Sequence, residues 1–92
     1  MRVVYREAVA DDLANIFSRI VKDDEAAARG VVNRITENVE RLGRFPRIGR
    51  AGSQPGTLEW VVPRLPYIVV YTVDFANDVL EVVAVFHTRR DR

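Results

Sequence analysis

The chain has 92 residues, of which 48% are hydrophobic and 29% are charged, and its 14 Lys and Arg against 13 Asp and Glu leave a formal net charge of +1. This composition predicts a single globular domain over residues 1–92 and excludes a disordered or collagen-like chain. The lack of cysteine excludes disulfides and thiolate metal sites, and the presence of one histidine, His87, excludes a histidine-rich site, so we expect no metal and no cofactor.

Arginine dominates the basic residues, since every one except Lys22 is an Arg. Arg suits two-pronged contacts to a phosphate or carboxylate better than Lys does. No apolar run approaches the roughly 18 residues of a membrane-spanning helix, and residues 1–7 lack the apolar core of a signal peptide, so we expect a cytoplasmic protein. The arginines include two groups: Arg41, Arg44, Arg47 and Arg50 at a spacing of three, and Arg89, Arg90 and Arg92 at the end.

The first two predicted elements are a strand and a helix. Residues 2–6 are predicted to form a short strand, and from about 8 to 22 the apolar residues recur at the period of one helix face. Asp11 and Asp12 fall in the first turns, where carboxylates meet the positive end of the helix dipole. The apolar face of this helix consists of Leu13, Ile16, Phe17, Ile20 and Val21.

A second helix is predicted to run from the N-cap candidates Asp23 and Asp24 to about Leu42, with Gly43 as the first residue beyond it. The connection between the two helices is only about three residues long, so they must form an antiparallel hairpin. The apolar seam of the second helix consists of Ala28, Val32, Ile35, Val39 and Leu42, at alternating spacings of four and three.

The second half of the chain is predicted to form a loop and three strands. Residues 43–57 hold four of the five glycines and two of the four prolines, which indicates a long loop of the kind that often carries function. Strands follow at 57–62, 67–74 and 79–87, and the middle one is apolar on both faces, as in a central strand. We therefore expect an α+β fold of order β-α-α-β-β-β, with the helix hairpin packed on one face of a small antiparallel sheet. The sequence does not predict which edge of the sheet the first strand joins.

With this order of elements, the chain resembles the RelE/ParE superfamily of toxins from bacterial type II toxin–antitoxin modules, and most of all its ParE-like branch. The resemblance covers essentially the whole chain. Its local features are a Pro-x-x-Gly loop, a Pro-Tyr-x-x-x-Tyr strand and a C-terminal His-x-x-Arg. They lie in the segments Phe45 to Gly49, Tyr67 to Tyr71 and Val85 to Asp91.

The resemblance implies a toxin that a cognate antitoxin neutralises by wrapping its C-terminal segment around it. ParE-like members poison DNA gyrase without being hydrolases and are linked to plasmid stabilization, whereas RelE-like members cut mRNA in the ribosomal A site. We therefore expect a gyrase inhibitor that works by binding. The alternatives are a ribosome-dependent mRNA endonuclease and a degenerate toxin that acts only as co-repressor with its antitoxin.

Only half of the chemistry of a ribonuclease can be found in the sequence. Attack by a 2′-OH needs a base, an acid and cations, and His87 is the only side chain that ordinarily titrates near neutral pH. Thr88 stands where several ribonuclease members carry Tyr, Arg64 falls in a turn, and residues 41–53 contain no acid. His87 is thus a catalytic candidate only if the protein is a ribonuclease. Its simpler interpretation is a strand-end residue hydrogen-bonded to backbone or to the Arg-rich tail.

The remaining candidates are binding residues. Arg41 and Arg44 are explained as cations at the negative end of the second helix, whereas the loop arginines lack that explanation. The apolar surplus fits a partner segment that lies in a groove or adds to a sheet edge. We expect that partner to be a small DNA-binding antitoxin with an amphipathic C-terminal segment, in a hetero-oligomer. Candidate target contacts are Arg47, Arg50, Arg64, His87, Arg89 and Arg90, and candidate antitoxin contacts are Trp60, Phe17 and Ile20.

Overall fold

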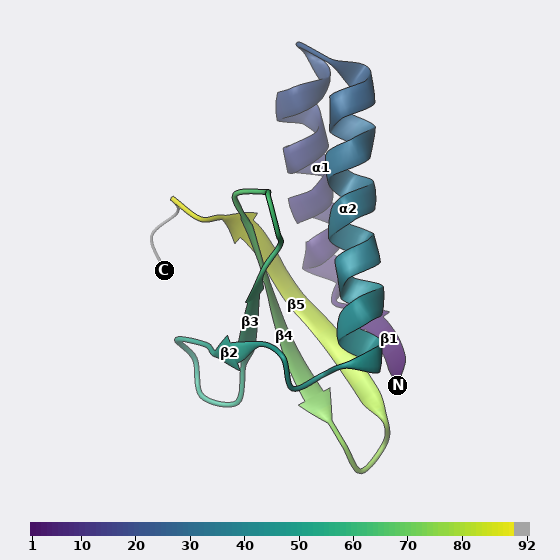
Figure 1. The fold of residues 1–92 in the computed structure, drawn as a ribbon, viewed down its shortest axis with the longest axis vertical. Helices are drawn as coiled ribbons and strands as arrows, with labels where there is room; N and C mark the ends of the chain where they lie inside the picture. The colour runs from purple at the N-terminus through teal and green to yellow at the C-terminus, as the bar shows by residue number, and fades with distance from the viewer. Residues whose placement is uncertain (90–92) are drawn as a thin grey trace.

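The protein has a helix hairpin that lies on one face of a five-stranded sheet (Figure 1). The structure is a computed structural model, and it describes residues 1–89. In chain order the elements are β1 (Arg2–Tyr5), α1 (Glu7–Val21), α2 (Glu25–Arg44), β2 (Arg50–Ala51), β3 (Leu58–Val61), β4 (Tyr67–Asp74) and β5 (Val79–His87). The α+β class and the predicted order of elements are confirmed. The structure also contains a two-residue strand, β2, within the segment that the sequence predicts to be a loop.

The sheet has the strand order β1-β5-β4-β3-β2. Strands β2 to β5 form an antiparallel meander, whereas β1 runs parallel to β5, with Arg2 opposite Val79 and Tyr5 opposite Val82. The sheet is therefore mixed. Parallel neighbours need a long crossover connection, and here the helix hairpin and the rest of the meander supply it. The first strand, β1, therefore joins the sheet at the edge formed by β5.

The start of α2 agrees with the prediction from the sequence, whereas its end does not. Asp24 caps α2, since its Oδ1 accepts a hydrogen bond of 3.0 Å from the N–H of Ala27, as predicted. The prediction for Gly43 was wrong, because α2 continues through Arg44 and Gly43 is a buried helical residue. A Cβ on Gly43 would lie 2.9 Å from Cγ2 of Val3. Gly43 therefore allows α2 to approach β1 closely and does not supply a left-handed turn.

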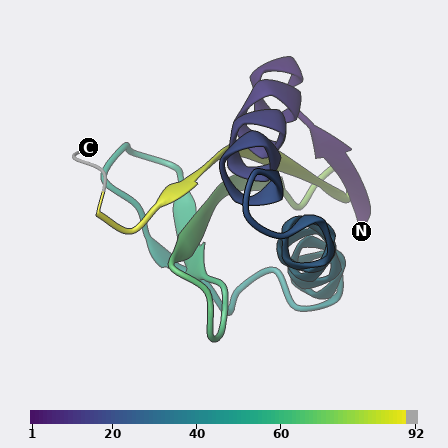
Figure 2. The ribbon, with the colours of Figure 1, turned by 90° about the horizontal axis from the view of Figure 1, so that it is seen from above.

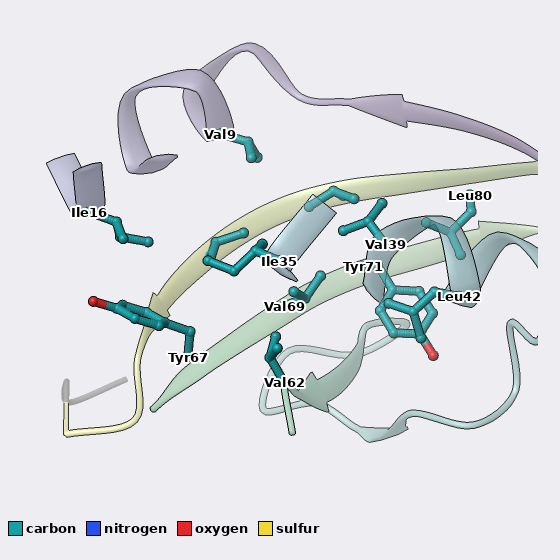
Figure 3. Packing of buried hydrophobic residues seen from close by; sticks show 12 residues of the cluster. Val9, Ile16, Ile35, Val39, Leu42, Val62, Tyr67, Val69, Tyr71 and Leu80 are labelled. Carbon is teal, nitrogen blue, oxygen red and sulfur yellow. The ribbon is translucent and has the colours of Figure 1, made fainter. Parts of the chain in front are cut away.

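The core lies between the hairpin and the sheet (Figures 2 and 3). Burying each aliphatic side chain in it contributes about 1.5–3 kcal/mol. The turn between α1 and α2 projects beyond the sheet (Figure 1), and the molecule measures 43 × 26 × 24 Å. Neither helix within residues 1–89 has a stretch long and apolar enough to cross a bilayer. The buried cluster contains Val9, Ile16, Ile35, Val39, Leu42, Val62, Tyr67, Val69, Tyr71, Leu80, Val82 and Val85.

Candidate functional site

The predicted target contacts do not form one site. Arg64, His87 and Arg89 lie at the same end of the sheet, because Tyr67 pairs with His87 and the N–H of Thr88 donates to the carbonyl of Pro66, 2.8 Å away. Arg64 sits in the β3–β4 turn with φ at 68°, a left-handed conformation that a non-glycine residue adopts only in special turns. Arg47 and Arg50 lie elsewhere, in and after the loop that follows α2. Arg90 is outside the described residues.

A cleft of about 660 Å³ opens between α1 and the end of β5. Two polar side chains of α1, Asn15 and Arg19, line it and were missed by the sequence reasoning. A signal for them existed, because Asp12, Asn15 and Arg19 recur at three and four residues and so share one helix face. The cleft is lined by Asp12, Asn15, Ile16, Arg19, Tyr67, Val85, Phe86, His87 and Arg89.

His87 is fixed at the mouth of this cleft by two contacts. Its Nδ1 accepts a hydrogen bond of 3.1 Å from the backbone N–H of Arg89. Its ring meets that of Tyr67 edge to face, with centroids 5.4 Å apart and an interplanar angle of 79°. The predicted hydrogen bond to backbone at the strand end is thus confirmed. A neutral imidazole whose Nδ1 accepts a hydrogen bond has its proton on Nε2.

Asp12, the carboxylate of the cleft, has a structural task. Its Oδ2 accepts a hydrogen bond of 3.0 Å from the backbone N–H of Val85. The strand β1 stops opposite Val82, so this N–H lies on a part of the β5 edge that β1 does not cover. Asp12 therefore substitutes for the missing strand. The acid in the first turn of α1 is Glu7, so the helix dipole does not explain the position of Asp12. Among residues 1–89, no group of three or more His, Asp or Glu is placed to hold a metal ion.

The loop after α2 is attached to the core through Tyr71. The buried hydroxyl donates a hydrogen bond of 2.8 Å to the carbonyl of Pro46 and accepts one of 3.0 Å from the N–H of Gly49. Burial raises the pKa of Tyr71, and the hydrogen bond from Gly49 opposes this only in part. A Cβ on Gly49 would collide with the same hydroxyl. Arg47, between the two anchored positions, stacks over the ring of Phe75, 4.1 Å from its centroid.

Arg50 and Trp60 lie on the strands nearest the outer edge of the sheet. Together with Ile48, they line a shallow pocket of about 190 Å³. The indole Nε1 of Trp60 donates a hydrogen bond of 3.0 Å to Oδ1 of Asn38, which links β3 to α2. The side chain is half-buried and packs against the core. Its contact with an antitoxin stays a prediction.

The two other antitoxin candidates, Phe17 and Ile20, are half-buried side chains of the projecting hairpin. Phe17 lines a groove of about 350 Å³ between the helices, together with Val32 and Asn33 of α2. Ile20 packs at the margin of the core. The hairpin extends beyond the sheet (Figure 1), and both side chains are partly exposed.

Comparison with known proteins gives a consistent result. The model of a family described as the ParE toxin of the type II toxin-antitoxin system parDE matches residues 3–92. A relative from Sinorhizobium fredii named "Putative toxin Y4kP" is 38% identical over 78 residues, which are 85% of this chain and 78% of that protein.

Solved structures share the fold at lower sequence identity. The chromosomal ParDE toxin–antitoxin system from P. aeruginosa matches with a TM-score of 0.82 and 21% identity, over 95% of both chains. The intact RelBE toxin–antitoxin complex of E. coli matches with a TM-score of 0.71 and 16% identity, over 97% of this chain and 98% of that chain. At these identities the structures establish the fold alone.

Proposed function

This chain belongs to the ParE toxin family of type II toxin–antitoxin systems, and from that membership we propose that it inhibits DNA gyrase by binding and is held inactive by a cognate antitoxin. The gyrase target comes from the family resemblance stated above. The proposal places the protein in the cytoplasm, where gyrase and the antitoxin would meet it. It also makes the toxin a binding protein, which the geometry around His87 supports.

The observation that favours a binding function over RNA cleavage is the hydrogen bonding of His87. Its Nδ1 accepts a hydrogen bond from the N–H of Arg89, so the ring nitrogen that lacks a proton in neutral imidazole faces the backbone. Asp12, the carboxylate that shares the cleft, accepts from the backbone of β5. Arg19 and Arg89 also line the cleft, and a guanidinium remains protonated near neutral pH and cannot act as a general base there. A nuclease would need a base and an acid that these residues do not provide.

We propose the antitoxin because this fold is shared with the solved ParDE toxin–antitoxin system and the RelBE toxin–antitoxin complex. We assign Phe17 and Ile20, at the projecting end of the hairpin, and Trp60 as its contacts. A partner of this kind would be a small DNA-binding protein whose amphipathic segment covers the apolar groove between α1 and α2. The complex would then be a toxin–antitoxin hetero-oligomer.

The experiment that tests this function compares two targets with the same purified toxin. Supercoiling of relaxed plasmid by gyrase, together with trapped double-strand breaks, measures the first. Cleavage of mRNA on translating ribosomes measures the second. Inhibition of supercoiling without RNA cleavage is expected, and cleaved mRNA with unaffected gyrase would instead support the endonuclease. Neither effect, with operator binding by the toxin–antitoxin complex intact, would support the co-repressor.

A further inference from the structure

Exposed apolar side chains concentrate around the loop after α2. Among residues 1–89, five large hydrophobic residues are exposed, and three of them are Phe45 at 54%, Ile48 at 39% and Phe75 at 50%. Phe45 and Ile48 belong to one turn, since the N–H of Ile48 donates to the carbonyl of Phe45. Arg47, in the same turn, lies against Phe75. We call these four residues the Arg47 surface. Exposed apolar groups gathered around an arginine are typical of the centre of a protein interface.

The guanidinium of Arg47 lies over the ring of Phe75. Its guanidinium carbon lies 4.1 Å from the centroid of Phe75, and such stacking leaves the N–H groups at the rim of the plane free to bond outward. Within residues 1–89, Arg47 forms no ion pair. The neighbouring Asp74 accepts from the N–H and the side-chain amide of Asn77, bonds that lower the pKa of Asp74. That carboxylate is thus engaged in its own turn.

Tyr71 fixes the position of this turn. Its hydroxyl bonds to Pro46 on one side of Arg47 and to Gly49 on the other. The ring belongs to the core cluster and the hydroxyl points out of it (Figure 3). Because the loop is already ordered, a partner would lose little entropy by ordering it on binding. Tyr71 is accordingly a positioning residue for Arg47.

The chemistry of the Arg47 surface selects its partner. Residues 41–53 contain four arginines and no acid, which favours a partner with negative charge. One face of the Phe75 ring is covered by Arg47, which removes a platform on which a nucleic-acid base would stack. Phe45 and Ile48 offer apolar contacts to side chains on both sides of a bound carboxylate. An acidic protein segment with neighbouring apolar side chains fits these features better than a nucleic acid does.

We infer that the Arg47 surface is where the protein target of the toxin docks, with a carboxylate bound by Arg47 and apolar side chains packed on Phe45 and Ile48. The inference rests on the proposed function, since it takes the toxin to act by binding a protein. The surface lies beyond the C-terminal end of α2, whereas Phe17 lies near its N-terminal end (Figure 1). A 20-residue helix is about 30 Å long, so the Arg47 surface can be tested separately from the antitoxin contacts Phe17 and Ile20. Trp60 lines one pocket with Ile48, so Ile48 is left unchanged in the test.

The test uses the full toxin with Arg47→Gln, Arg47→Lys, Phe75→Leu and the control Arg34→Gln, an exposed arginine in the middle of α2. The toxin concentration for half-maximal gyrase inhibition should rise about 10-fold or more for Arg47→Gln and less for Arg47→Lys, which keeps the charge but loses the planar fork. Arg34→Gln should match wild type. Antitoxin affinity, measured on the same proteins, should stay unchanged in all four.

Growth arrest on induction, at equal toxin levels by immunoblot, decides the inference even if gyrase is not the target. Loss of arrest with Arg47→Gln and Phe75→Leu, but not with Arg34→Gln, supports it. Arrest as strong as in wild type overturns it, as does a wild-type toxin that causes none. Tyr71→Phe, which leaves Arg47 and Phe75 in the chain, should weaken arrest at a temperature where circular dichroism shows it folded.

Two probes identify the chemistry that the surface binds. A short peptide of alternating glutamate and leucine should bind wild type and Arg34→Gln, and bind Arg47→Gln about 10-fold or more weakly, as expected for loss of a charge-assisted pair. Short poly-deoxythymidine should show no dependence on Arg47. Binding of the oligonucleotide that depends on Arg47, with no binding of the peptide, would overturn the inference in favour of a nucleic-acid surface.

Discussion

The carboxylate of Asp12 in α1 accepts a 3.0 Å hydrogen bond from the backbone N–H of Val85 in β5, 73 residues later in the chain. The contact joins the first helix to the last strand at the point where β1 no longer covers β5. An unpaired strand edge is a hazard for aggregation. Asp12 pairs with one N–H of this exposed edge, that of Val85. The same contact places α1 over the end of the sheet where His87 lies.

Replacement of Asp12 by Ala should lower the free energy of unfolding by about 1–3 kcal/mol, because it leaves the N–H of Val85 without its partner. Urea denaturation measures the effect. Asp11→Ala is the matched control, since Asp11 is exposed on the same turn of α1 and its side chain forms no hydrogen bond or ion pair within residues 1–89. It should change stability by no more than about 0.5 kcal/mol. Equal losses for both variants would show that charge near the start of α1, and not the bond to β5, is what matters.

Two glycines of α2 should respond to alanine in opposite directions. Gly30 is exposed, and a Cβ there would meet nothing within 4 Å. Gly30→Ala should therefore raise stability by about 0.5–1 kcal/mol, the helix preference of Ala over Gly. Gly43→Ala gains the same preference but forces a Cβ to 2.9 Å from Val3, and overpacking costs about 1–3 kcal/mol. A thermal melt of the pair should give shifts of opposite sign, and a stabilised Gly43→Ala would contradict the close approach of α2 to β1.

Tyr71→Phe should lower the free energy of unfolding by about 1–3 kcal/mol at neutral pH, since Pro46 and Gly49 both lose their hydrogen-bond partner. The folded protein raises the pKa of Tyr71, so it favours the neutral phenol. That stabilisation is fully present below the ordinary tyrosine pKa of about 10 and is lost as the pH rises through the folded-state pKa. The stability gap between wild type and Tyr71→Phe should therefore narrow above about pH 10, as chemical denaturation at several pH values would show. A constant gap would contradict the shift.

The turn between β4 and β5, which contains Asp74 and Asn77, should lose stability in acid. The Asp74 carboxylate accepts two hydrogen bonds from Asn77, and these lower its pKa. Their contribution is present above the ordinary aspartate pKa of about 4 and is lost as the pH falls through the lower folded-state pKa. NMR titration of the Asp74 carboxyl should give a midpoint below that of Asp74 in Asn77→Ala. The backbone N–H of residue 77 remains in this variant, so identical midpoints would show that the side-chain amide of Asn77 does not contribute to the shift.

Much of the fold follows from local patterns. The helix period from Leu13 to Val21 and the seam from Ala28 to Leu42 predict the hairpin, and the strands at 67–74 and 79–87 are found at their predicted bounds. The edge that β1 joins could not be predicted, because strand pairing over such a distance has no local signature. The strand β2 has only two residues, too few to show the alternation of apolar and polar residues that predicts a strand. Gly43 was misassigned because a close approach and a left-handed turn both select glycine.

The candidate site was harder to predict, because it depends on which elements meet. Arg19 shares one face of α1 with Asp12 and Asn15, but only the position of β5 beside α1 makes that face the wall of a cleft. Arg47 and Phe75 are 28 positions apart, and only the anchoring of the loop by Tyr71 brings them together. By contrast, the hydrogen bond of His87 to nearby backbone was predictable, since it spans only two residues at a strand end.

His87→Gln should retain growth arrest and gyrase inhibition within about 3-fold of wild type, because a residue that contributes only a rim contact loses little on truncation. The hydrogen bond from Arg89 engages Nδ1 in a contact that needs no proton transfer, and glutamine can offer an amide oxygen in its place. Toxicity should also be flat with pH across the ordinary histidine range near 6.5, whereas a catalytic imidazole would impose a slope there. A loss of toxicity by about 100-fold or more in His87→Gln, with normal folding and antitoxin binding, would refute the binding mechanism and restore His87 as the base of a ribonuclease.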